Sequence, residues 1–350
     1  MSKPGVLSPH ADAPASPPFV EPPDALASGQ APSVDISVCI VNWNCRELLR
    51  DCLESLRRQI RSIRWEVIVV DNGSTDGAAD MVERDFPEAT LLRNRANLGF
   101  SRANNQAARL ARGRFLFFLN NDTVLPPGAL EDLVDYADAH PGIGILGPRL
   151  RDARGRIQIS YRKNLTVGAL LHRTMLFRWT GMFRRSYFRC RRQSFDTDTP
   201  RRVEVLMGAA MLLPGKVFMD SGMWDEGYTF GGEDMDLCYR VSRRWPVVYH
   251  PGIEILHYGR AATRQHVRFA ATKIPAGFVR YFSKTSSSPV LLLLYKSVAT
   301  IDAPVQLLAN TIQFLYRKIF GKPEKARKSL LAVKSSWHFL VHGLSEFWKA

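Results

Sequence analysis

Cysteine is scarce in this chain, and none of its cysteines form a closely spaced pair. There are five in 350 residues, an odd number with wide spacing and no CxxC pair. Disulfide frameworks and zinc sites need regular cysteine spacing, so we expect neither. Unpaired thiols are typical of proteins in a reducing cytosol, which is the compartment we expect. The five are Cys39, Cys45, Cys52, Cys190 and Cys238.

The sequence also lacks an apolar signal-peptide core and a clean transmembrane run. Residues 1–33 carry eight prolines among Ala and Ser, which predicts a disordered tail. Residues 290–295 are apolar but few, and residues 301–320 are interrupted by side chains such as Asp302 and Arg317. Because a membrane span needs about 20 predominantly apolar residues, neither segment predicts one.

Acidic residues are rare in two regions, although the formal net charge of the whole chain is only +15. Residues 149–202 hold fifteen Arg or Lys against three Asp or Glu, and residues 261–350 hold fourteen against three. Such asymmetry favours an anionic partner, either a phospholipid surface, a nucleic acid or a polyphosphorylated substrate, over ordinary solvated charge. The first basic region has no zinc knuckle, RNA-recognition signature or helix-turn-helix motif, so we expect no nucleic acid partner.

What the sequence does contain is an alternation of short apolar runs and helical patterns. Apolar runs predict strands, and spacing of three or four residues predicts amphipathic helices. The predicted strands are 36–41, 65–70, 90–92, 114–119, 203–213, 246–250 and 254–257. The predicted helices are 46–59, 101–111, 127–140 and 233–244, with another beginning near Gly215. Strands that alternate with helices indicate a parallel α/β sheet.

The strand at 114–119 ends in a group of polar residues. Residues 115–119 are all apolar and run directly into Asn120, Asn121 and Asp122. Such a run is typical of a strand buried on both faces. Ligands of open α/β sheets bind just beyond the carboxyl ends of the strands. A carboxylate fixed there after two amides is suited to hold a divalent cation beside a phosphate group.

Polar residues follow two other strands in the same way. Residues 41–44 come directly after the first strand, and Asp71 comes directly after the second. Asn and Asp are common turn formers, so each cluster alone is weak. Because the carboxyl ends of parallel strands meet at one edge, the three clusters together predict a common site.

A fourth cluster supplies carboxylates of a different kind. Gly231 and Gly232 precede Glu233 and Asp234, and glycines permit close approach of a substrate. A carboxylate here is a candidate general base, although the alternative is that both acids only favour a helix amino terminus. His257 follows a strand-like run and is a candidate metal ligand beside Asp122; the alternative is a core histidine.

Five segments of this chain resemble glycosyltransferase family 2, and most of all its rhamnosyltransferase-like branch. They occur in the family's order within residues 34–265, and they are 37–44, 67–76, 97–105, 118–122 and 231–240. The resemblance implies a GT-A fold, that is, a Rossmann-like mixed, mainly parallel sheet flanked by helices. It also implies an inverting, divalent-metal-dependent transfer of a sugar from a nucleotide-diphosphate donor.

The resemblance also implies roles for individual residues. Asp234 matches the catalytic base, with Glu233 as its neighbour. Asp122 matches the carboxylate of the DxD-like motif that holds Mg²⁺ or Mn²⁺, and His257 would be a further ligand. Asn120 and Asn121 stand where many relatives have Asp. The implied nucleotide and donor contacts are Val41, Trp43, Asp71, Asn104, Asn121, Gly208 and Ala209.

These roles are chemically consistent with one another. In an inverting transfer the acceptor oxygen attacks the anomeric carbon opposite the leaving diphosphate. One side needs a base, and the other needs positive charge on the leaving group. No covalent intermediate is required, so no nucleophilic Ser or Cys is expected.

We therefore expect a disordered tail at 1–33, a GT-A domain at 34–285 and a basic amphipathic helical segment at 286–350. This segment is expected to bind an anionic membrane surface, since it combines basic residues with tryptophans; the alternative is packing on the domain or on a partner subunit. The expected enzyme works at the cytoplasmic face of the cell membrane and moves rhamnose from dTDP-rhamnose to a lipid-linked or cell-envelope glycan. Two alternatives are a UDP-sugar donor and a non-catalytic nucleotide-sugar-binding scaffold.

Overall fold

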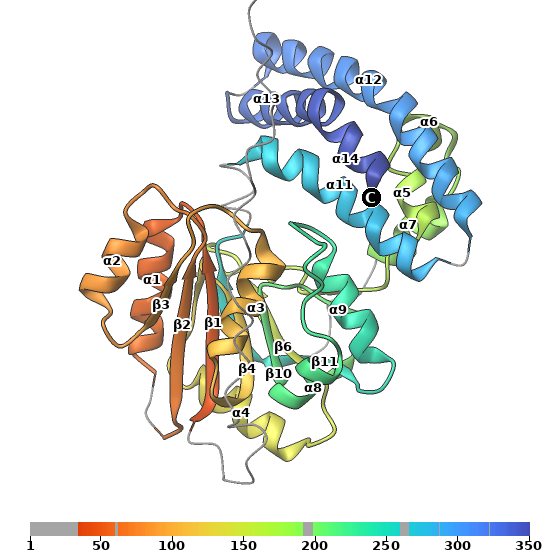
Figure 1. Ribbon diagram of the computed structural model, residues 1–350. Helices are drawn as coiled ribbons and strands as arrows, with labels where there is room; N and C mark the ends of the chain where they lie inside the picture. The colour runs from red at the N-terminus through yellow and green to blue at the C-terminus, as the bar shows by residue number, and fades with distance from the viewer. Residues whose placement is uncertain (1–33, 60–61, 192–198, 260–265, 287, 322) are drawn as a thin grey trace, which may run out of the picture.

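The computed structural model describes residues 34–59, 62–191, 199–259, 266–286, 288–321 and 323–350 (Figure 1). The expected disordered tail at 1–33 lies outside these residues. A large sheet with helices on both faces forms one part of the molecule, and a group of helices lies against one end of it (Figure 1).

The first half of the sheet is parallel. Its strands are β1 (Val34–Asn42), β2 (Trp65–Asp71), β3 (Thr90–Arg93) and β4 (Gly113–Asn120). Strand β1 is central, with β2 on one side and β4 on the other. Asn42 pairs with Asp71, and Val41 pairs with Asn120. The polar residues at the ends of the three strands therefore lie side by side at the same edge of the sheet. The helices α1 (Arg46–Arg57), α2 (Ala78–Asp85) and α3 (Phe100–Leu110) make the crossovers.

The second half of the sheet is mixed. Strand β10 (Ala210–Pro214) runs antiparallel to both β4 and β6 (Ile145–Arg151). Strand β11 (Val247–His257) is parallel to β6 and antiparallel to β5 (Thr123–Val124) and β8 (Arg201–Arg202). The order through the described sheet is β3-β2-β1-β4-β10-β6-β11-β5. The prediction of a mixed, mainly parallel sheet is confirmed.

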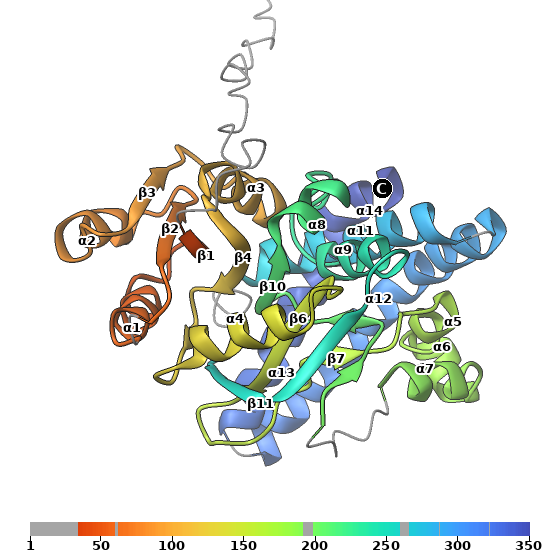
Figure 2. The same ribbon diagram turned by 90° about the horizontal axis from the view of Figure 1, so that it is seen from below.

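Helices bury both faces of this sheet (Figure 2). Strand β1 alternates between them: Ile36, Val38 and Ile40 pack with α1, α2 and α4 (Ala129–Ala139), whereas Cys39 packs with the other layer. That other layer contains α3, α8 (Gly215–Asp220) and α9 (Glu233–Ser242). A strand covered on both sides needs apolar residues at every position, which explains the unbroken apolar run of β4.

Two strand predictions were wrong in detail. The run at 203–213 is not one strand, because β9 (Val205–Leu206) pairs with β7 (Tyr161–Arg162) in a separate small sheet, and only β10 joins the large one. The segments 246–250 and 254–257 are one strand, β11, whose pairing with β6 shifts register between His250 and Glu254. Strands β5 and β6 were not predicted. Local composition does not reveal which partner a short strand will find.

Helices dominate the basic regions. Residues 149–202 contain the short helices α5 (Val167–Leu171), α6 (Met175–Thr180) and α7 (Arg184–Arg191). The last part of the chain contains α11 (Val267–Thr285), α12 (Pro289–Phe320), α13 (Pro323–His338), a π-helical turn (Phe339–Gly343) and α14 (Leu344–Lys349). The apolar segments 290–295 and 301–320 are thus one helix of 32 residues, which is long and apolar enough to cross a bilayer. That corrects the sequence interpretation, which treated them as two separate pieces.

Helix α11 joins the helical group to the sheet domain. A Cβ atom on Gly277 would lie 1.7 Å from the carbonyl oxygen of Gly231, so the helix backbone touches the Gly231–Gly232 loop directly. Asp225 in the same loop accepts hydrogen bonds from Arg280 and from Lys284, both at 2.9 Å. Helix α11 also packs against α13 and α14. It therefore contacts both parts of the molecule, and the division after residue 285 stays a prediction.

Candidate active site

The polar residues at the three parallel strand ends are linked by hydrogen bonds. The side-chain amide of Asn121 donates to Asn42 Oδ1 at 2.6 Å, and Asn42 Nδ2 donates to Asp71 Oδ1 at 3.3 Å. The other oxygen of Asp71 accepts from the backbone N–H of Ser74 at 3.0 Å. The ends of β4, β1 and β2 are thereby fixed relative to one another.

A cavity of about 240 Å³ opens at this edge of the sheet. Most of the residues predicted to bind the donor or to act in catalysis line it. They are Val41, Trp43, Asn121, Asp122, Gly208, Ala209, Glu233 and Asp234. Two predicted donor contacts do not. Asp71 lies buried behind the strand ends, and Asn104 is buried within α3, where its Nδ2 donates to the carbonyl of Phe100 at 3.0 Å.

The beginning of α11 covers one side of this cavity. The ring of His266 stacks on Trp43 with centroids 3.9 Å apart, and Phe269 packs against the same indole at 5.3 Å. Burial lowers the pKa of His266, which favours the neutral ring. Its Nε2 is buried and has no hydrogen-bond partner among the described residues. Trp43 thus forms part of an aromatic wall that the sequence analysis did not anticipate.

Asp122 and His257 lie together although 135 positions separate them in the chain. Pairing of β11 with β5 sets His257 opposite Thr123, and His257 Nε2 then lies 3.3 Å from Asp122 Oδ1. Both side chains are only 7% exposed. Gln158 Nε2 donates to the His257 carbonyl, so Gln158 Oε1 is left to accept from His257 Nδ1 at 2.9 Å. In the neutral ring this tautomer leaves the Nε2 lone pair directed toward Asp122.

This pair fits part of a divalent metal site. A carboxylate oxygen and an imidazole nitrogen are suitable donors, and a second hydrogen bond that holds the imidazole is usual for metal-binding histidines. Across the described ranges, no group of three or more His, Cys, Asp or Glu side chains is close enough to hold an ion. The described residues therefore offer two donors here, which suits an ion that keeps water or phosphate as its other ligands.

The adjacent carboxyls of Glu233 and Asp234 lie in contrasting surroundings. Arg162 Nη2 lies 3.3 and 3.2 Å from the two carboxylate oxygens of Asp234, and the Met235 N–H donates to Asp234 Oδ1 at 2.8 Å. Glu233 is buried, and its Oε2 has no partner among the described residues. Burial, and then the charge of Asp234, raise the pKa of Glu233 well above its usual range. The site therefore favours the neutral form of Glu233, whereas Asp234 next to it is paired with Arg162.

The segment at Gly208 and Ala209 connects the two sides of the cavity. A Cβ atom on Gly208 would lie 3.5 Å from Asp234 Cβ, and the carbonyl of Ala209 accepts from the Asn120 N–H at 2.9 Å. The residues between β9 and β10 therefore lie between Asp234 on one side and the Asn120–Asp122 tripeptide on the other.

Among the residues of this site that the sequence analysis missed are Arg162, Gln158 and His266. Arg162 is one of fifteen Arg or Lys in residues 149–202, and nothing local distinguishes it from the others. Gln158 and His266 stand in segments without a recognisable motif. Only their positions in the fold identify them.

Comparison with known proteins gives a consistent result. Residues 37–199 match the model of the family described as Glycosyl transferase family 2. A curated relative is the N-acetylglucosaminyl-diphospho-decaprenol L-rhamnosyltransferase of Mycobacterium tuberculosis. It is 31% identical over 211 residues, which make up 56% of this chain and 67% of the relative. The O-antigen biosynthesis protein RfbC of Myxococcus xanthus is 27% identical over 238 residues, or 65% of this chain but 18% of its own length.

Solved structures agree in fold. The crystal structure of GalNAc-T7 with UDP, GalNAc and Mn²⁺ matches with a TM-score of 0.50 and 15% identity, and covers 76% of this chain and 54% of that one. The crystal structure of Staphylococcus aureus TarS 1-349 in complex with UDP also matches with a TM-score of 0.50 and 15% identity, and covers 87% and 91%. At this level of identity the likeness shows a common GT-A fold and nothing about substrates.

Proposed function

The chain belongs to glycosyltransferase family 2, in its rhamnosyltransferase-like branch, and we propose that it transfers a sugar, with inversion, from a nucleotide-diphosphate donor to a hydroxyl group. The observation that carries this proposal is that Asp122, which pairs with His257, and Asp234, which pairs with Arg162, line the same cavity. We assign one carboxylate to a metal–diphosphate complex and the other to proton removal.

In this proposal Asp234 accepts the proton of the incoming acceptor hydroxyl. Arg162 holds the Asp234 carboxylate in place, and Gly208 leaves room for the donor sugar beside it. Glu233 stays protonated, so it adds no second negative charge next to the base. General-base catalysis of this kind contributes roughly 10²- to 10⁴-fold to the rate.

The donor would lie across the ends of β1, β2 and β4. Val41 and Trp43 would line the base pocket, and Asn121 and Ala209 would contact the donor. Asp71 is buried and accepts from Asn42 and Ser74, so it would hold the strand ends in place rather than accept from the uracil or thymine ring. The Asn104 side chain bonds to the backbone of its own helix, α3. Its role would therefore be to hold that helix against the site rather than to contact the nucleotide.

Asp122 and His257 would hold Mg²⁺ or Mn²⁺. Such an ion supplies positive charge that stabilises the leaving diphosphate. Gln158 fixes the tautomer and orientation of His257 that this requires. Asn121 is engaged by Asn42 through its amide, which leaves Asp122 as the charged ligand of the tripeptide.

We propose rhamnose, carried as dTDP-rhamnose, as the transferred sugar, and a lipid-linked or cell-envelope glycan as the acceptor. Support comes from the Mycobacterium tuberculosis relative, whose name specifies an L-rhamnosyltransferase acting on N-acetylglucosaminyl-diphospho-decaprenol. A UDP-sugar donor is the alternative within the same reaction class.

The proposed location is the cytoplasmic face of the cell membrane, with α12 lying on the bilayer. Asp302, in the middle of α12, is 4% exposed; its oxygens accept from the Met175 N–H at 2.8 Å and from Gln306 at 2.6 Å. Crossing the bilayer would break these contacts and bury a carboxylate in lipid. An interfacial position keeps them.

The test is nucleotide release by the purified protein from a panel of sugar nucleotides, with lipid extract and Mn²⁺ each present or absent. We expect turnover that depends on both additions and is fastest with dTDP-rhamnose. A faster rate with a UDP-sugar would select the alternative donor. Absence of turnover under every condition would contradict the enzymatic proposal.

A non-catalytic scaffold is distinguished by the Asp234→Asn variant. An enzyme loses transfer and keeps donor binding, whereas a scaffold keeps its function. Asp80→Asn is the matched control, because Asp80 also pairs with an arginine, Arg93, but on the exposed surface of α2. Equal effects of the two substitutions would contradict a catalytic role for Asp234.

A further inference from the structure

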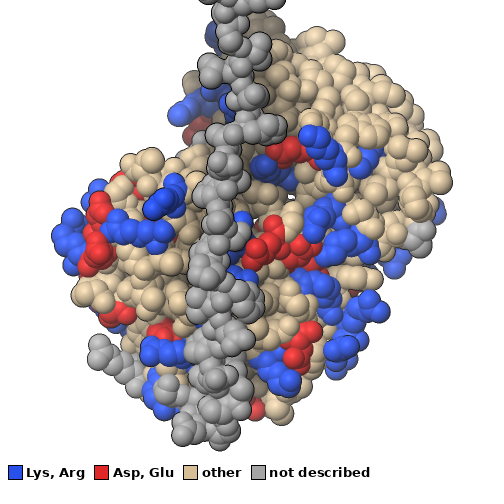
Figure 3. All heavy atoms as spheres, viewed as in Figure 1, with Lys and Arg blue, Asp and Glu red and all other residues tan. Residues whose placement is uncertain are grey.

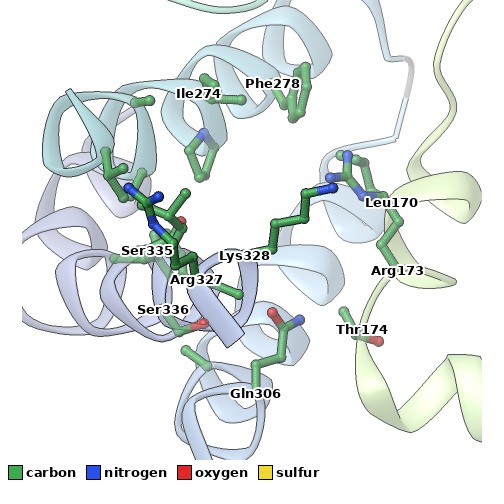
Figure 4. Close-up of a pocket in the computed structure, with 18 of the residues that line it drawn as sticks. Leu170, Arg173, Thr174, Ile274, Phe278, Gln306, Arg327, Lys328, Ser335 and Ser336 are labelled. Atoms are coloured by element: carbon green, nitrogen blue, oxygen red, sulfur yellow. The ribbon is translucent and has the colours of Figure 1, made fainter. Parts of the chain in front are cut away.

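A second and much larger cavity lies beside the candidate active site. Its volume is about 1390 Å³, larger than the roughly 300–1,000 Å³ of ordinary small-molecule pockets. Its walls come from α5 and the turn after it, from α11, α12 and α13, and from the turn at 152–156 (Figure 4). Segments far apart in the sequence therefore line it, and it is open to solvent.

The cavity carries an excess of positive charge. Five basic side chains line it, against the two acids Asp152 and Glu324; they are Arg154, Arg156, Arg173, Arg327 and Lys328. Asp152 is already paired with Arg156 at 2.6 Å. Within the described part of the chain, the charged ends of the other four have no hydrogen bond or ion pair. Arg173 reaches into the cavity from the turn after α5 and Lys328 from α13, and the two side chains point toward one another (Figure 4).

Arg173 and Lys328 are both solvent-exposed, so water screens the repulsion between their charges. An anion between them would interact favourably with both. A group with several oxygens, such as a diphosphate, can accept hydrogen bonds from a guanidinium and an ammonium at once.

Apolar side chains also line the cavity, together with polar ones such as Thr174, Gln306 and Ser335. The apolar ones include Leu170, Ile274, Phe278, Tyr295, Leu331 and Phe339. A purely ionic ligand gains nothing from such a surface. The combination of basic side chains and apolar walls instead matches an amphiphile, in which a negatively charged group is joined to a hydrocarbon chain.

The cavity adjoins both the active site and the proposed membrane face. Ala270 lines both cavities, and Ile274 packs against the backbone of Gly231, three positions before Asp234. On the other side, Tyr295 and Ala299 of α12 face the cavity, whereas Ile301, Leu308, Ile312 and Ile319 of the same helix are 59–72% exposed. In Figure 3 the region of α12 is almost free of charged residues.

From these observations we propose that this second cavity binds the diphosphate and the adjoining hydrocarbon of a lipid-diphosphate-linked acceptor. The assignment rests on the proposed function, because it names where the acceptor is held. Arg173 and Lys328 bind the diphosphate oxygens, and the side chains around Phe278 and Tyr295 bind the start of the chain. The remaining chain leaves along α12 into the bilayer, and the sugar faces Asp234.

Binding of farnesyl diphosphate to the full-length protein tests this without any need for transfer. We expect binding by titration calorimetry, with inorganic pyrophosphate much weaker because it lacks the chain. In the double variant Arg173→Gln and Lys328→Gln the affinity should fall by about tenfold or more, because hydrogen bonds to charged groups are lost. The double variant Arg173→Lys and Lys328→Arg keeps both charges and should retain most of the affinity.

The matched control is Lys318→Gln with Lys325→Gln, which removes two positive charges from α12 and α13 outside the cavity lining. It should bind farnesyl diphosphate as the wild type does. Equal losses in both double variants, or equally tight binding of pyrophosphate, would overturn the assignment. So would a selective loss of binding to phosphatidylglycerol vesicles in the cavity variant, since the two charges would then serve the membrane surface.

Transfer assays separate this inference from the proposed function. With the lipid-linked acceptor, the cavity variant should show a raised KM for the acceptor and an unchanged affinity for the nucleotide donor. Farnesyl diphosphate binding without transfer by the wild type would count against the proposed function and support the cavity. Transfer without such binding would overturn the cavity assignment alone.

Discussion

Arg162 Nη2 donates hydrogen bonds to both carboxylate oxygens of Asp234, at 3.3 and 3.2 Å, although 72 positions separate the residues. Arg162 is in β7 and Asp234 is in the first turn of α9. The contact fixes the direction of the carboxylate and stabilises its charge in a cavity wall where Asp234 is only 14% exposed. The small β7–β9 sheet, which lies outside the main sheet, therefore contributes directly to the site.

Substitution of Arg162 by Gln is expected to lower kcat on the order of 10- to 100-fold, because misplacing a catalytic group by about 1 Å can cost as much. The KM for the donor nucleotide should stay near that of the wild type, and Arg162→Lys should recover part of the rate. Steady-state kinetics with the sugar nucleotide measure both parameters. The control is Arg93→Gln, which breaks exposed ion pairs with Asp80 and Glu83; a similar loss there would contradict a positioning role for Arg162.

Gln158 is expected to tune metal binding through His257. The Gln158→Leu variant removes the acceptor of the His257 Nδ1 hydrogen bond, and loss of such a contact typically costs about 10- to 100-fold in metal affinity. The measurement is Mn²⁺ titration by calorimetry in the presence of nucleoside diphosphate. His257→Ala should weaken binding at least as much. His250→Gln, on the same strand, is the control, and unchanged Mn²⁺ affinity in both site variants would refute the assignment.

Glu233 should make stability depend on pH in a predictable direction. Its pKa is raised in the fold, so above the ordinary Glu value the unfolded chain releases a proton that the folded protein keeps. The unfolded state then binds fewer protons, and the free energy of unfolding falls as the pH rises toward the raised pKa. The slope is at most about 1.4 kcal/mol per pH unit for one group.

The Glu233→Gln variant has no such proton, so its Tm relative to the wild type should increase between pH 5 and pH 8. Thermal unfolding followed by circular dichroism measures this difference. Glu54→Gln changes an exposed residue of α1 and serves as the control, with a flat difference across the same range. A flat difference for Glu233→Gln as well would show that the carboxyl ionises normally.

The contact between α11 and the Gly231–Gly232 loop should tolerate no added side-chain atom. In Gly277→Ala the new Cβ would meet the Gly231 carbonyl oxygen at 1.7 Å, so the backbone must move. We expect destabilisation of about 1–3 kcal/mol, typical of overpacking, and reduced transfer because the loop leads into Glu233 and Asp234. Chemical denaturation gives the stability change. Gly142→Ala, where a Cβ would meet nothing within 4 Å, should be neutral; similar losses in both would contradict the packing argument.

The exposed face of α12 is expected to bind the bilayer. Deleting residues 289–350 is a poor test, because it would also remove the buried Tyr295 and Phe347 from the core. Leu308→Glu is milder and should weaken binding to anionic vesicles by roughly 10- to 100-fold, the equivalent of one lost buried apolar side chain. Vesicle co-sedimentation measures it. Gln313→Glu adds the same charge at an exposed polar position, and equal release by the two variants would rule out apolar insertion of this face.

The sheet and its polar edge followed from the sequence because their signals are local. The apolar runs that became β1, β2 and β4 must pack on both faces, and the polar residues after them end each strand at the same edge. The motifs around Asp122 and Asp234 were recognised for the same reason, since each is contiguous in the chain. The sequence did not predict the strands β5 and β6, whose pairing partners lie far along the chain, or the division between β9 and β10.

Tertiary structure alone decided which side chains meet. The pairing of β11 with β5 sets His257 beside Asp122, and the pairing of β7 with β9 sets Arg162 where it reaches Asp234. The tertiary fold also buries the Asn104 side chain in the core, and it places α11 between the two cavities. The sequence by itself determined the chemical groups available and the sheet edge that carries them. Which groups become partners, and which carboxyl keeps its proton, depends on long-range register and burial, and neither is encoded in any local stretch of residues.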